Sequence, residues 1–120
     1  MEKLVSKLAG LGIAGLVLFF VIGTSGLAGA ATLTSSLAVL GGPLGMLGGI
    51  FTLGLLEMAA SGITKYGFDA IAKGVVEELI TKGKSKDEII EEINDFPVIS
   101  NDLKTKLRDF VNNYTEKKQG

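Results

Sequence analysis

Residues 8–56 read LAGLGIAGLVLFFVIGTSGLAGAATLTSSLAVLGGPLGMLGGIFTLGLL and contain no ionisable side chain. A helix that crosses a bilayer needs about 20 apolar residues, so this stretch is long enough for two passes. Its glycines suit membrane helices, in which close backbone approach replaces the hydrophobic effect as the force between helices. The sequence therefore predicts a small all-α integral membrane protein, with a two-pass, glycine-rich transmembrane hairpin in residues 1–60.

Basic residues flank the uncharged stretch on both sides. Lys3 and Lys7 precede it, and lysines from Lys65 onward follow it. Because basic residues concentrate on the cytoplasmic side of a membrane, we expect both termini in the cytoplasm, or on the equivalent face of an organelle. That arrangement requires an even number of passes.

Residues 1–30 also fit a secretory signal, which is an open alternative. They contain a basic start, an apolar stretch and small residues at 28–30 that suit a cleavage site. Residues 31–56 are still apolar, so cleavage would leave a protein with one span. We therefore favour an uncleaved chain with two passes.

Glycine clusters divide the uncharged stretch into helical pieces. Either an outer turn lies within residues 23–36 and Pro43 kinks the second pass, or three shorter helices share the layer. By composition, residues 2–22, 27–40 and 44–60 are expected to be helical, with interruptions at residues 23–26 and 41–43.

The charged tail begins with a predicted joint at Ser61 and Gly62. Residues 61–82 are expected to form an amphipathic juxtamembrane helix, whose polar stripe repeats every four residues. This helix either packs on the rest of the tail or lies on the membrane surface. Its stripe consists of Lys65, Asp69, Lys73 and Glu77, opposite Ile71, Val75 and Leu79.

The sequence predicts a charged C-terminal helical hairpin in residues 83–120. Ser85 and Glu88 form a capping box at the start of its first helix, which stops at Pro97, and Ser100 caps the second. The first helix is acidic and the second is basic on much of its surface, so we expect the two to pair. A protein partner is a candidate ligand of this hairpin.

Composition excludes several classes of function. The chain has no Cys and no His, which removes thiolate and imidazole chemistry and the usual zinc ligands. A net charge of -1 offers no electrostatic basis for nucleic-acid binding. We find no nucleophile with a base, no phosphate-binding loop and no cation-binding loop. We therefore predict no enzyme activity, no catalytic residues, no metal site and no cofactor.

The sharpest motif is a glycine ridge formed by Gly41, Gly45 and Gly49 at helical spacing, with Gly42 and Gly48 beside it. Missing side chains along such a ridge let another helix approach closely. The partner helix belongs either to a second copy, which predicts a homo-oligomer, or to the other pass of the same chain.

Glu57 is the acid nearest to the uncharged stretch. An ionisable residue inside a membrane suggests a proton or ion role. Because Glu57 falls near the end of the second pass, its side chain can instead reach interfacial water.

Residues 26–76 resemble the small, glycine-rich, interferon-inducible membrane proteins. The similarity lies in small residues at 28–36, the glycine cluster at 41–49 and Ser-Gly-Ile-Thr-Lys-Tyr at 61–66. The resemblance implies association with intracellular membranes and regulation of cell death. The charged tail after Thr81 is unlike that family.

The sequence therefore leaves two alternative functions. In the first, the chain self-associates in a lipid bilayer through the glycine ridge and permeabilises or remodels it, as a toxin, a phage holin or a cell-death effector would. In the second, residues 1–60 are an anchor that presents the C-terminal helices to a protein partner.

Overall fold

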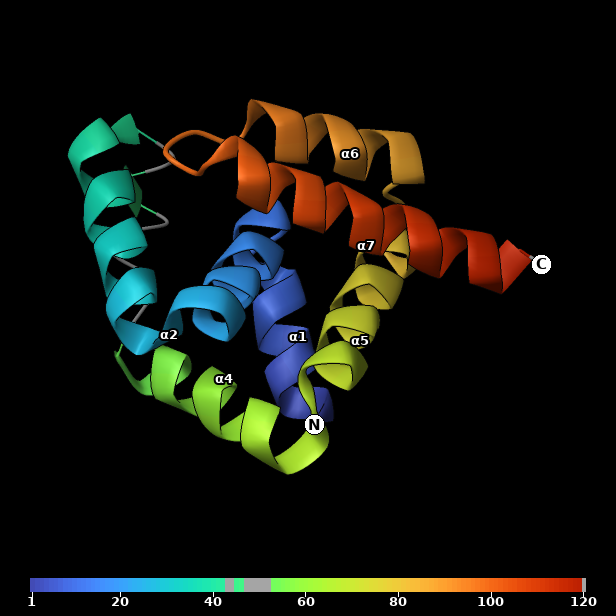
Figure 1. The fold of residues 1–120 in the computed structure, drawn as a ribbon, viewed down its shortest axis with the longest axis horizontal. Coiled ribbons are helices and arrows are strands. Elements are labelled where there is room, and N and C mark those ends of the chain that lie inside the picture. The colour runs from blue at the N-terminus through green and yellow to red at the C-terminus, as the bar shows by residue number, and fades with distance from the viewer. Residues whose placement is uncertain (43–44, 47–52, 120) are drawn as a thin grey trace.

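The computed structural model describes residues 1–42, 45–46 and 53–119, and every element in this part of the chain is a helix (Figure 1). The all-α prediction is thereby confirmed. One hydrophobic core draws residues from the N-terminal, middle and C-terminal thirds of the chain. The helices are α1 (Glu2–Gly10), α2 (Ile13–Leu40), α4 (Leu53–Tyr66), α5 (Phe68–Thr81), α6 (Lys86–Asp95) and α7 (Asn101–Gln119).

Helix α2 is the centre of the fold, and its bounds differ from those expected. The helix predicted for residues 2–22 is divided after α1, where Gly12 adopts φ 68. The interruption predicted at residues 23–26 is a kink, because Gly26 has φ 72 and the helix continues to Leu40. Glycine adopts such angles at no steric cost. Gly41 ends α2 with φ 71, where an interruption was expected.

The two sides of this kink have different surroundings. Residues 13–22, the inner half of α2, are buried at every position, and α1, α5, α6 and α7 all contact α2. In Figure 1, residues 23–40, the outer half, turn at the kink and form the left edge of the molecule, with their lower end beside the start of α4.

Three glycines bring α1 close to its neighbours. A Cβ atom on Gly15 would fall on the backbone carbonyl of Leu8, so α1 and α2 approach more closely than any other residue would permit. A Cβ on Gly74 would lie 3.0 Å from Val5 of α1, and one on Gly62 would overlap Leu4. Glycine therefore serves packing within this chain, as it does between membrane helices.

Aromatic rings close the bundle at the end of the inner half. The Phe68 ring stacks on Phe19 and meets Phe20 edge to face, with both pairs of centroids 4.9 Å apart. Phe20 also meets Phe110 of α7 at 5.4 Å. These edge-to-face and stacked pairs stabilise the fold beyond the burial of their apolar surface. The cluster ties α2 to α5 and α7.

The joint expected at Ser61 and Gly62 is wrong, because α4 runs through it to Tyr66. The break falls at Gly67, which has φ 92, and it divides the helix predicted for residues 61–82 between α4 and α5. Gly62 is instead a point of close packing against α1. The predicted apolar stripe of Ile71, Val75 and Leu79 is buried as expected.

The C-terminal hairpin has the predicted boundaries. Ser85 and Glu88 form the capping box, α6 ends at Asp95, and the Ser100 hydroxyl accepts the amide hydrogen of Leu103 at 3.1 Å. Helices α6 and α7 pack on each other. Two side chains of α7 donate hydrogen bonds to Asn94 of α6. Lys104 donates to its backbone carbonyl and Arg108 to its side-chain oxygen.

Candidate membrane-interaction region

Among the described helices, α2 alone is long and apolar enough to cross a membrane. Of its candidate membrane window, 61% is buried inside the protein, and it lies near the N-terminus. Core helices and signal sequences share these properties. Length and composition therefore leave the membrane role of α2 open, and exposure is the property that separates its two halves.

The outer half of α2 exposes most of its surface. Val39 is 86% exposed and Leu40 49% exposed. Buried positions of the outer half are Ala30, Leu33 and Leu37, which recur at helical spacing on one side. That side faces other parts of the protein, because these three side chains are buried. The remaining surface carries small, apolar and hydroxyl-bearing residues and no charge.

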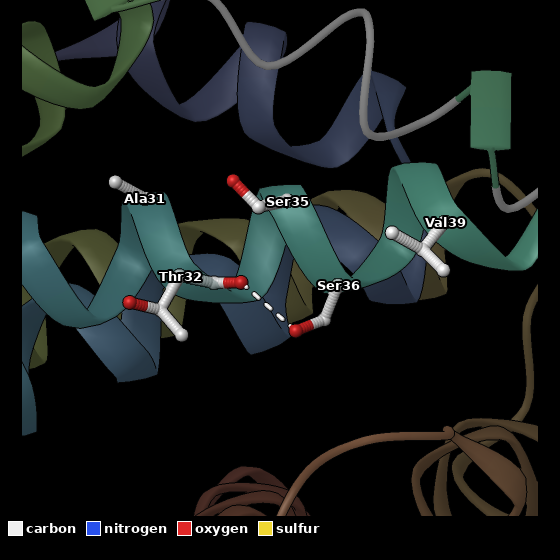
Figure 2. Close-up of a pocket in the computed structure, with 5 residues that line it drawn as sticks. All are labelled: Ala31, Thr32, Ser35, Ser36 and Val39. Carbon is white, nitrogen blue, oxygen red and sulfur yellow. Dashed lines mark hydrogen bonds between the residues drawn. The ribbon is translucent and has the colours of Figure 1, made fainter.

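Four of the six hydroxyl groups on the outer half hydrogen-bond to backbone carbonyls of the helix itself. Ser36 donates to the carbonyl of Thr32 at 3.0 Å (Figure 2). Thr32 donates to the carbonyl of Ala28, also at 3.0 Å. Thr24 and Thr34 make similar bonds to carbonyls three or four residues earlier. An unpaired hydroxyl is costly in an apolar medium, so these bonds suit a helix that leaves water.

A shallow hollow of about 400 Å³ runs along the same surface (Figure 2). Its lining is small and weakly polar, and contains no charged group. The hollow offers a neighbouring helix or an acyl chain space to approach, without chemistry for catalysis. It is lined by Ala31, Thr32, Ser35, Ser36 and Val39.

The structure places part of the predicted glycine ridge. Gly41 and Gly42 are exposed with φ 71 and 57, so the start of the ridge departs from α-helical geometry. The Gly45 amide donates to the Gly41 carbonyl at 2.9 Å. Gly48 and Gly49 lie outside the described residues. The ridge as an oligomerisation surface therefore stays a prediction.

Glu57 lies on α4, and its side chain is exposed. The following residues Met58 and Ala59 are half-buried and buried, which places Glu57 on the outer side of that helix. An exposed carboxylate at this position is compatible with interfacial water, and the intramembrane role stays a prediction.

Sequence reasoning missed several glycines that pack closely within the chain, among them Gly15, Gly62 and Gly74. Their signal was present, because an isolated glycine inside a helical pattern often marks close packing. Gly62 was instead interpreted as a joint. The partner that each glycine contacts is far away in sequence, so the pattern by itself did not distinguish packing from interruption.

Within the described residues, no group of three or more acidic side chains is arranged to hold a metal ion. Comparison with known protein families, curated proteins and solved structures finds no match to this chain.

Proposed function

We propose that this protein acts in a lipid bilayer, which it enters with the uncharged outer half of α2 and the residues that follow. The observation that carries the proposal is the exposed, uncharged surface of the outer half, on which the hydroxyls of Thr24, Thr32, Thr34 and Ser36 are bonded to the helix itself. In water this surface leaves apolar groups such as Val39 solvated, and transfer to lipid removes that cost.

The proposed hairpin keeps two passes but moves the first from residues 2–22 to residues 23–40. Eighteen helical residues extend about 27 Å, close to the hydrocarbon thickness of a bilayer of about 30 Å. The inner half then stays inside a water-side bundle formed by α1, α5, α6 and α7. Both termini belong to this bundle, which we place on the cytoplasmic face because its lysines flank the proposed hairpin.

Inside the bilayer, we propose, copies of the hairpin associate through Gly41, Gly45 and Gly49 and permeabilise or remodel the membrane. Small residues on the outer half support this, because the hollow lined by Ala31 and Ser35 lets another helix approach. The activity is therefore of the toxin, holin or cell-death-effector kind.

Single-cysteine labelling tests the insertion, because the chain has no cysteine of its own. In intact membranes, Ser35→Cys should resist a water-soluble maleimide, whereas Ser6→Cys and Thr105→Cys should both react from one side. Carbonate extraction should leave the protein in the membrane pellet. Reaction at Ser35→Cys equal to that at Thr105→Cys would contradict the proposed hairpin.

Dye release from liposomes tests permeabilisation. The wild-type chain should release a small entrapped dye, and Gly45→Leu should abolish release by filling the ridge. Gly10→Leu is the matched control, since Gly10 is exposed on α1 with nothing within 4 Å of an added Cβ. Liposomes that stay sealed at high protein load would contradict this activity.

An anchor or adaptor is the second candidate function. The α6–α7 hairpin favours it, because a capping box and the Asn94 contacts build a defined water-side surface that a bare pore does not need. Capture of a specific partner by the full chain, lost on reversing charge at exposed Lys106 and Asp109, would support this role. Unchanged capture by that variant would count against it.

A further inference from the structure

A second hollow, of about 230 Å³, lies between the start of α1 and the end of α4. Its buried lining is apolar, with Leu4 and Gly62 buried and Met58 half-buried. Its exposed lining consists of Met1, Lys3, Ser61, Lys65 and Tyr66. The described residues that line it include Lys3, Lys65 and Tyr66, and none of them is acidic.

Positive charge gathers at the mouth of this hollow. The Lys65 Nζ atom lies 5.3 Å from the centroid of the Tyr66 ring. The amino group of Met1 and the Lys65 ammonium both favour the ionised phenol and so lower the pKa of Tyr66 below its usual value. An environment that favours a phenolate also favours a bound anion.

The position of the hollow suggests which kind of anion it binds. Helix α4 leads from uncharged Leu56 to Lys65 over about 14 Å, from the end of the proposed membrane segment toward the water-side bundle. Lipid headgroups occupy this depth, and tyrosine is enriched there. The apolar lining from Leu4 and Met58 suits the glycerol and first acyl carbons of a lipid better than it suits a free ion.

We propose that this hollow binds the phosphate headgroup of an anionic phospholipid, an inference that rests on the proposed function. The ammonium groups of Lys3 and Lys65 pair with the phosphate, and the Tyr66 hydroxyl donates a hydrogen bond to it. Leu4 and Met58 contact the apolar part of the lipid. The bound lipid fixes α1 and α4 at the membrane surface.

Vesicle flotation of the full chain tests the site. Binding is compared between phosphatidylcholine vesicles and vesicles that also contain phosphatidylglycerol. The double variant Lys3→Gln/Lys65→Gln should lose the preference for anionic vesicles by on the order of tenfold, because each lysine near such a surface contributes to binding. Its binding to neutral vesicles should not change, and Lys3→Arg/Lys65→Arg should retain the preference.

Lys82→Gln/Lys106→Gln is the matched control, because it removes the same charge from exposed lysines on either side of α6. It should retain the preference. An equal loss of the preference in both double variants would show that anionic vesicles attract the lysines without a specific site. That result would overturn the lipid site but not the proposed function. Competition by inorganic phosphate at constant ionic strength would assign the hollow to a free anion and also overturn it. Absence of binding to both kinds of vesicle would overturn the proposed function, and the lipid site with it.

Discussion

The two halves of α2 have similar composition and opposite surroundings. The inner half, residues 13–22, and the outer half, residues 23–40, are both uncharged and belong to one helix. The inner half is buried throughout by helices that carry the protein's charges on their outer sides, whereas the outer half exposes residues such as Val39. One uncharged helix is thus a protein core in its first turns and an exposed surface in the turns that follow.

The largest expected effect comes from introducing a carboxylate into each half of α2. Val17→Asp places a carboxylate where the side chain is 0% exposed, and we expect loss of the folded bundle, since an unpaired buried charge costs several kcal/mol. Thr32→Asp places the same group on the exposed outer half and should leave the fold intact while preventing membrane insertion. Circular dichroism and carbonate extraction measure the two outcomes. Equal unfolding of both variants would break the distinction between the halves.

Truncation of one large side chain gives the next effect. Phe19→Ala removes a fully buried ring that stacks on Phe68, and we expect the free energy of unfolding to fall by about 3–5 kcal/mol. Leu40→Ala, at a half-exposed site on the outer half, should cost less than about 1 kcal/mol. Urea denaturation of each variant measures these differences. A loss at Leu40 as large as that at Phe19 would show that the outer half is packed as a core.

Glycine packing of the inner half gives an intermediate effect. Gly15→Ala should destabilise the bundle by about 1–3 kcal/mol, because its Cβ would meet the Leu8 carbonyl and α1 would have to move. Gly10→Ala is the control in α1, where nothing lies within 4 Å of an added Cβ. It should stabilise the helix by up to about 1 kcal/mol. Opposite signs in thermal denaturation would confirm that close approach, and not helix propensity, governs Gly15.

The smallest expected effect concerns α6, one of the helices that pack on α2. Ser85→Ala removes the capping bond to the Glu88 amide, and α6 should lose about 1 kcal/mol of stability. Because α6 packs against α2, amide hydrogen exchange should rise in α6 and in the inner half. Exchange in the outer half should not change. A uniform rise along all of α2 would contradict the separate surroundings of its halves.

Local signals in the sequence predicted the helix ends that depend on neighbouring residues. Ser85 with Glu88, Ser100, and the glycines at 41 and 83 all end or begin helices as expected, because a cap is satisfied by atoms within a few residues. Gly62 and Gly67 show where this reasoning fails. Both are glycines in helical sequence, and only contact with Leu4 of α1 distinguishes the packed Gly62 from the positive φ of Gly67.

The candidate membrane region was predictable in part. The absence of charge in residues 8–56 indicated an apolar region, and the interruption at Gly41 was expected there. The first pass was expected at residues 2–22, and the sequence does not show that other helices bury residues 13–22. The hydroxyl bonds of Thr32 and Ser36 likewise required coordinates.

The sequence by itself determined that this chain is helical, that its charge is segregated from a long apolar region, and where its capped helices begin. These properties follow from side-chain chemistry and from contacts a few residues apart. Tertiary structure alone decided that the inner half of α2 is a core and that Gly15, Gly62 and Gly74 are packing sites. The physical reason is that burial and close approach depend on partners distant in sequence, and an apolar residue is equally suited to a protein interior and to lipid.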